Sequence, residues 1–150
     1  MFKKIQQFFN EQLTLQDSDS ESQQPKVDLA AAALLIELSR ADFEISTVEQ
    51  QAIEQALIKT LGLAQTQLNQ LIELAELENK QATSLFEFTR HINEAYSSTQ
   101  KFELLKALWQ VAVADGDISK YEDNLIRKIA GLIYAPHSDF IKSKLAVINR

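Results

Sequence analysis

The sequence predicts an all-α protein, a compact bundle of about seven helices. Only three glycines and two prolines occur in 150 residues, so few positions interrupt a helix. The interior is rich in alanine, leucine, glutamine, glutamate and lysine, which lose little conformational freedom in a helix. From residue 26 onward the apolar residues recur with a period near 3.6, and no segment has the alternation of a strand.

Composition narrows the classes of function. The 45% share of hydrophobic residues is enough for the core of one domain. The absence of cysteine excludes disulfides, thiolate zinc sites and iron–sulfur clusters, and it favours a cytoplasmic location. A net charge of −6 with scattered basic residues argues against nucleic acid as a partner. The most apolar run, Leu29 to Leu38, is too short to cross a bilayer.

Residues 1–13 predict an amphipathic segment ahead of the main domain. Its apolar stripe consists of Phe2, Ile5, Phe9 and Leu13. Residues 14–25 are acidic and polar, as in a flexible linker, so we place the start of the helical domain near Pro25, giving a domain of residues 26–150. Two interpretations of the stripe remain open: weak, reversible contact with a membrane or a protein partner, or packing on the chain's own domain.

Breakers and caps divide residues 26–150 into seven helices. The first is apolar nearly all round, so it should be central. In the second, five residues should point inward: Val48, Ile53, Ala56, Leu57 and Leu61. Gly62 should end that helix, and Trp109 should lie in the core. The expected ranges are 27–40, 47–61, 66–79, a fourth helix capped by Ser84, a fifth from the cap pair Ser97 and Ser98 to 114, 120–133, and 138 to the end.

A short acidic sequence occurs twice. Shifting the chain by 73 positions (115 − 42) lays Asp42-x-Glu44-Ile-Ser46-x-x-Glu49 on Asp115-x-Asp117-Ile-Ser119-x-x-Glu122. The helix before each copy and the helix after it stay in step. We therefore predict a duplicated three-helix unit, with the fourth helix joining the two copies.

Two interpretations of these acidic loops remain open. In the first, Ser46 with Glu49 and Ser119 with Glu122 form capping boxes, in which the serine oxygen accepts the amide of the third helical residue and the glutamate reaches back to the serine amide. The remaining carboxylates would then favour the positive end of the helix dipole.

In the second interpretation the carboxylates bind a divalent cation, since Mg²⁺ and Ca²⁺ prefer oxygen ligands. The candidate ligands are Asp115, Asp117, Glu122, Asp42, Glu44 and Glu49. The second loop is not an EF-hand, because Lys120 stands at the position of the glycine and Ile126 at that of the final glutamate.

The sequence from Val113 to Ser119, with Glu122 and the helices on both sides, resembles the tellurite-resistance TerB-like family over about residues 26–150. The resemblance implies a compact all-helical domain whose paired acidic Ala-Asp-Gly loops bind a divalent metal such as Ca²⁺, Mg²⁺, Mn²⁺ or Zn²⁺. Related domains occur in larger proteins, including the membrane-anchored co-chaperone DjlA. The first loop departs from the family pattern, because Phe43 stands where the second has Gly116.

The sequence carries no recognisable catalytic motif. His91 and His137 lie in different predicted segments and define no zinc site or catalytic pair. We therefore expect a non-enzymatic module that binds a divalent metal and a protein partner, with a role in tellurite or other stress resistance. The alternative is a co-chaperone-like or membrane-proximal adaptor in which the acidic loops only cap helices. A hydrolase using a metal between the loops is a third interpretation.

Overall fold

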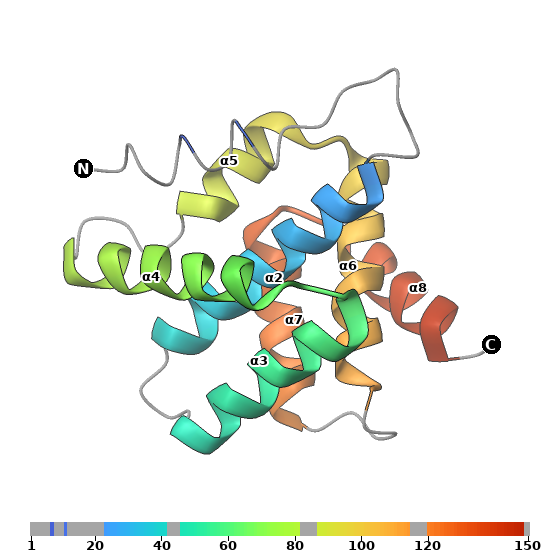
Figure 1. Cartoon of the computed structure of the whole chain (residues 1–150). Helices are drawn as coiled ribbons and strands as arrows, with labels where there is room; N and C mark the ends of the chain where they lie inside the picture. Colours follow the sequence, from blue (N-terminus) through green and yellow to red (C-terminus); the bar gives the residue numbers. More distant parts are fainter. Residues whose placement is uncertain are drawn as a thin grey trace.

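The computed structural model describes residues 7, 11, 23–41, 46–81, 87–114 and 120–148. These ranges contain seven helices and no strand, which confirms the all-α prediction (Figure 1). The helices are α2 (Gln23–Ala41), α3 (Thr47–Leu61), α4 (Gln65–Gln81), α5 (Glu87–Ala95), α6 (Ser98–Ala112), α7 (Lys120–Leu132) and α8 (His137–Ile148).

The observed helix ends agree closely with the sequence prediction. Helix α3 has the predicted bounds, and the other helices begin or end within a few residues of theirs. The largest difference is at α2, which begins at Gln23 because Pro25 fits the first turn of a helix, where no amide is needed. Ser97 caps α6 in a complete capping box, whereas Ser84 lies outside the described residues.

Helix α2 is the centre of the bundle, as predicted. It contacts α3, α4, α5, α6 and α7, which surround it in Figure 1. Every residue from Leu29 to Ser39 is buried, and Ala30 to Leu34 have no exposed surface. The four consecutive alanines at 30–33 occupy little volume, so neighbouring helices can approach α2 from several sides.

The two predicted three-helix units have the same arrangement of contacts between their helices. Helix α2 lies against α3 and α4, and α6 lies against α7 and α8. Helices α3 and α7 begin 73 residues apart (120 − 47). All seven buried residues of α6 have buried counterparts on α2 at this shift. Helix α6 is less completely covered than α2, because it is only partly buried at four positions where α2 is buried: Phe102, Glu103, Lys106 and Gln110.

The helices after the two acidic loops end in a left-handed residue. At the end of α3 this residue is Gly62, with φ of 69°. At the end of α7 it is Tyr134, with φ of 58°, an uncommon conformation for a bulky side chain. The Ala135 amide donates to the Ala130 carbonyl at 2.9 Å, and the Tyr134 amide donates to the Gly131 carbonyl at 3.2 Å. This is the hydrogen-bond pattern of a Schellman cap.

Helix α5 joins the two units. It packs against α2, and the Asn93 side-chain amide donates to the Leu132 carbonyl at the end of α7 at 2.9 Å. Ile92 and Tyr96 are both buried. Burial raises the pKa of the Tyr96 phenol above its ordinary value, because the core disfavours the charged phenolate.

One sequence prediction is wrong, and another concerns residues that the structure does not describe. Val48 was expected to point inward, but 74% of its surface is exposed, because the first turn of α3 extends past the core. The amino-terminal stripe of Phe2, Ile5, Phe9 and Leu13 lies outside the described residues. Of that segment only Gln7 and Glu11 are described, and the Gln7 amide donates to the Glu11 carboxylate at 3.2 Å.

The alanines of α2 give the first testable prediction. Ala33→Leu should lower the free energy of unfolding by about 1–3 kcal/mol, because a larger side chain has no room at a position with no exposed surface. Urea denaturation followed by circular dichroism measures this loss. Ala52→Leu, at an exposed position of α3, is the matched control and should change stability by less than about 0.5 kcal/mol. Equal effects in the two variants would contradict tight packing around α2.

Candidate functional site at the loop-to-helix turns

The predicted site residues fall into two groups. Ser46, Glu49 and Glu122 are described, and all three stand at or near the beginning of α3 or α7. The others lie outside the described residues: Asp42, Glu44, Asp115, Asp117 and Ser119. The described part of the chain contains no group of three histidine, cysteine or acidic side chains placed to hold a metal ion. The described geometry of the predicted site is therefore that of the first turns of α3 and α7.

Ser46 caps α3. Its Oγ atom accepts a hydrogen bond from the Glu49 amide at 3.1 Å, as the sequence predicts. The Ser46 hydroxyl in turn donates to Glu49 Oε1 at 3.1 Å, so the carboxylate contacts the serine hydroxyl and not the serine amide. The first half of the predicted capping box is confirmed, and the second half takes a different form. Glu49 thus helps to fix the start of α3.

A second contact ties the start of α3 to the end of α2. The Gln50 side-chain amide donates to the Ser39 carbonyl at 3.3 Å. Ser39 itself is fully buried, and its hydroxyl donates to the Ile36 carbonyl at 3.1 Å. Both ends of the chain around the first acidic loop are therefore held by polar contacts.

Helix α7 begins at the position equivalent to the start of α3. Its first residue is Lys120, so Glu122 is its third residue, as Glu49 is the third residue of α3. Glu122 is half-buried. The amino-terminal ends of α3 and α7 both lie along the lower edge of the molecule in Figure 1. The two helix starts therefore present their amide ends at the same edge in that view.

The chain leaves α6 earlier than it leaves α2. Helix α6 ends at Ala112, and the Val113 amide still donates to the Trp109 carbonyl at 3.0 Å. The Ala114 amide then donates to the Val111 carbonyl at 3.2 Å, which forms a turn. The equivalent of Ala114 is Ala41, which is still within α2. More of the chain is consequently available between α6 and α7 than between α2 and α3.

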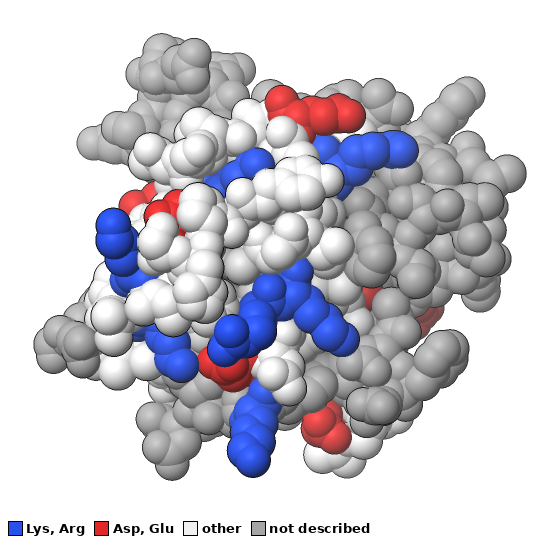
Figure 2. All heavy atoms as spheres, turned by 180° about the vertical axis from the view of Figure 1, so that it is seen from behind, with Lys and Arg blue, Asp and Glu red and all other residues white. Residues whose placement is uncertain are grey.

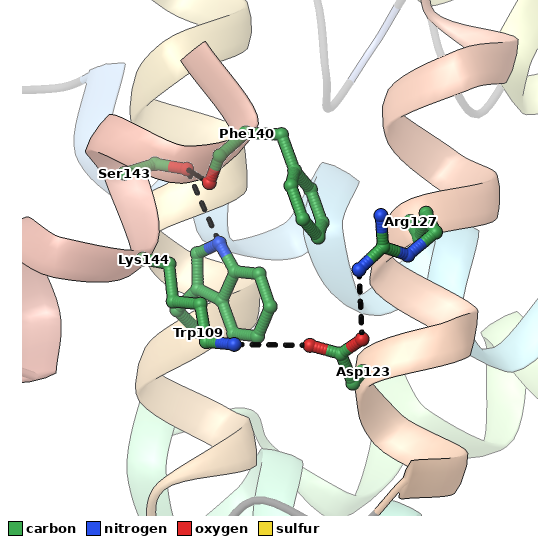
Figure 3. A network of polar contacts seen from close by, with 6 residues as sticks. All are labelled: Trp109, Asp123, Arg127, Phe140, Ser143 and Lys144. Atoms are coloured by element: carbon green, nitrogen blue, oxygen red, sulfur yellow. Dashed lines mark hydrogen bonds and ion pairs between the residues drawn. The ribbon is translucent and has the colours of Figure 1, made fainter. Parts of the chain in front are cut away.

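Asp123, the residue after Glu122, connects α7 with α8 (Figure 3). Its Oδ1 atom is 3.2 Å from Lys144 Nζ, and its Oδ2 atom is 3.3 Å from Arg127 Nη2. The Asp123 side chain is 21% exposed, so its ion pairs are partly shielded from solvent. The first turn of α7 is thereby fixed against α8.

The same cations lie over aromatic rings. Arg127 is 4.7 Å from the centre of the Phe140 ring, and Lys144 is 5.2 Å from that of Trp109. The two rings meet edge to face with their centres 5.2 Å apart, as Figure 3 shows. Both distances from cation to ring allow attraction to the ring quadrupole. His137, assigned no site by sequence, stacks on Phe140.

Trp109 is a core residue, as predicted. It has no exposed surface, and its indole Nε1–H donates to Ser143 Oγ at 3.1 Å. The Ser143 hydroxyl donates to the Phe140 carbonyl at 3.0 Å. The one polar atom of this large side chain is thus satisfied inside the bundle.

Sequence reasoning did not single out this network. The spacing of Asp123 and Arg127, four residues apart on one helix, is a usable signal for an ion pair. No local signal joins Asp123 to Lys144, 21 positions further along the chain. That contact depends on how α7 packs against α8.

Loss of the Ser143 hydroxyl tests the buried network. Ser143→Ala should lower the free energy of unfolding by about 1–3 kcal/mol, because the indole N–H of Trp109 would stay buried without its acceptor. Urea denaturation measures the loss. Ser98→Ala, at the exposed first residue of α6, serves as the control and should have little effect. A Ser143→Ala protein as stable as the parent would contradict the assigned bond.

The shared frame of α3 and α7 gives a prediction for Ser119. If it caps α7 as Ser46 caps α3, Ser46→Ala and Ser119→Ala should each cost about 1 kcal/mol of stability. Thermal unfolding of the two variants side by side measures this. A cost at Ser46 alone would show that the second loop begins its helix in another way.

Comparison with known proteins places the chain in a family. The family described as Tellurite resistance protein TerB matches residues 28–145, a span that begins in α2 and ends in α8. No curated protein and no solved structure matches the chain significantly. None of the described helices is long and apolar enough to span a membrane. The matched span covers both loop-to-helix turns, and the chain belongs to the TerB family.

Proposed function

We propose that this chain is a non-enzymatic TerB-family module that binds one divalent cation at its second acidic loop and presents its helical surface to a protein partner. The ligands are the carboxylates of Asp115, Asp117 and Glu122. Asp42, Glu44 and Glu49 of the first loop take no part in this site.

The observation that carries the proposal is the difference between the two glutamates that begin the helices. Glu49 is exposed and is engaged by the Ser46 hydroxyl, which gives it a structural role at the start of α3. Glu122 stands at the equivalent position of α7 but is half-buried. The second loop also keeps Gly116 and follows an earlier exit from α6, so more backbone is available to turn around an ion.

The donor chemistry fits a hard cation. Three carboxylates and loop carbonyls are the ligands that Ca²⁺, Mg²⁺ and Mn²⁺ favour, and the chain has no thiolate to offer Zn²⁺. A bound cation would neutralise carboxylates that are close together and would order the turn before α7. Because Asp123 ties the first turn of α7 to α8, the ordering would occur next to a fixed part of the bundle.

A titration tests the cation site. Adding Ca²⁺, Mg²⁺, Mn²⁺ or Zn²⁺ separately to the ¹⁵N-labelled protein should give saturable amide shifts, or Mn²⁺ broadening, confined to residues 113–123 for at least one ion. Asp117→Asn should abolish the response, because it removes a charged ligand while keeping its size. Asp42→Asn is the matched control in the first loop and should leave it unchanged. Absence of a saturable response to all four ions would sink the cation proposal.

A second candidate function rests on the Ser46–Glu49 contact. If the second loop also only caps its helix, the chain is a co-chaperone-like or membrane-proximal adaptor that needs no metal. Partner binding that is indifferent to chelators, together with a silent titration, would favour this function.

The family name suggests a cellular test of the cation proposal in stress resistance. Cells with Asp117→Asn should grow less well on tellurite than cells with the parent chain.

A further inference from the structure

The outer side of α8 carries an apolar stripe that the bundle leaves uncovered. Ile141, Leu145 and Ile148 are 39%, 48% and 45% exposed. Their spacing of four and three residues puts them on one helix face, two turns long. The opposite face of α8 is buried against the bundle through Phe140, Ser143 and Val147. Helix α8 therefore has one face in the core and a second apolar face in solvent.

Basic side chains lie on both sides of this stripe. At helical spacing, the exposed Lys142 stands on one edge and Lys144 on the other. Lys144 contacts Asp123 of α7, so its edge adjoins α7. Helix α7 adds one exposed cation there, Arg127, which shares the Asp123 carboxylate with Lys144. The stripe is thus bordered by positive charge.

The charge of this region is opposite to that of the whole chain. Helices α6, α7 and α8 carry seven basic residues (Lys101, Lys106, Lys120, Arg127, Lys128, Lys142 and Lys144) and four acidic ones (Glu103, Glu122, Asp123 and Asp139). The net charge of the chain is −6. Figure 2 shows lysine and arginine side chains spread over the face of the molecule seen from behind. An apolar surface with a basic border complements a partner that is apolar in the centre and acidic at its edges.

We propose that the stripe of Ile141, Leu145 and Ile148 on α8 docks an acidic amphipathic helix of a partner protein. The partner's apolar residues at i, i+3 or i+4 and i+7 pack on the stripe, and its flanking carboxylates pair with Lys142 and Arg127. The proposal rests on the protein-interaction part of the proposed function and is independent of the cation part.

A helix fits this surface better than a membrane does. Between 39% and 48% of each residue of the stripe is exposed, so each side chain is about half covered by α8 and its neighbours. Insertion into a bilayer requires apolar side chains that reach several ångströms into the acyl boundary. Two turns of a partner helix, in contrast, need only a flat apolar strip of matching length. The small exposed area indicates a weak and reversible complex.

The experiment uses the full chain and a fluorescein-labelled designed peptide of about 18 residues, with leucines on one helical face and glutamates on both flanks. Fluorescence anisotropy should show saturable binding, and amide shifts in the labelled protein should map to residues 137–148. Raising the salt from about 50 mM to about 300 mM should weaken binding. The same peptide with lysines in place of the glutamates should not bind.

Two variants of α8 provide the matched comparison. Leu145→Gln should weaken peptide binding at least about tenfold, whereas Ala146→Gln, exposed on the same helix outside the stripe, should change it less than about twofold. Lys142→Gln should weaken binding, and Lys59→Gln on α3 should not. Circular dichroism and thermal unfolding check that every variant keeps the fold.

Several outcomes would overturn the proposal. Equal binding of the acidic and basic peptides would remove the charge argument, and Leu145→Gln binding as tightly as the parent would remove the stripe. Binding to phosphatidylcholine vesicles with about one quarter phosphatidylserine, lost in Leu145→Gln, would make the stripe a membrane contact. Self-association lost in that variant would make a second copy the occupant. Measuring peptide binding in EDTA and in Asp117→Asn keeps the result separate from the cation proposal.

Discussion

The structure depends on the burial of α2. A helix whose residues are covered on every side needs neighbours all round, and α2 contacts five of the other six described helices. Its run of alanines allows those neighbours to approach closely, and its larger residues, such as Leu34 and Ile36, fill the spaces between them. Helix α6 has the corresponding role in the second unit and packs against α2 itself. The two loop-to-helix turns begin where these two central helices end.

Contacts of the described helix residues hold the chain on both sides of the first acidic loop and directly after the second. The end of α2 is held by the core, and the start of α3 is held by the Ser46 cap and by Gln50 on the Ser39 carbonyl. In the second unit the first turn of α7 is held against α8 through Asp123 and Lys144. The described helix residues that flank the first acidic loop and follow the second are therefore held by specific polar contacts.

The two halves of the duplicated unit have diverged in their cores as well as at their surfaces: Ile36 of α2 corresponds to the buried Trp109 of α6, and the buried Leu71 of α4 corresponds to Lys144 of α8. Buried positions of α6 match buried positions of α2, but Gln50 of α3 corresponds to Asp123 of α7. Gln50 bonds to a backbone carbonyl, whereas Asp123 forms ion pairs with two cations. The second half also carries the basic residues that border the exposed stripe of α8.

The sequence by itself determined the helices, their order, the central place of α2 and the repeat of 73 positions, because each of these follows from local propensity and apolar periodicity. It also placed caps at Ser46 and at the Ser97–Ser98 pair, of which Ser97 caps α6, since a cap depends on residues within one turn. Only the tertiary structure decided that Val48 is exposed, that Lys144 meets Asp123, and that α8 keeps an uncovered apolar face. Those features depend on which helices pack together, and periodicity gives a helix its apolar faces without saying which of them a neighbour will cover.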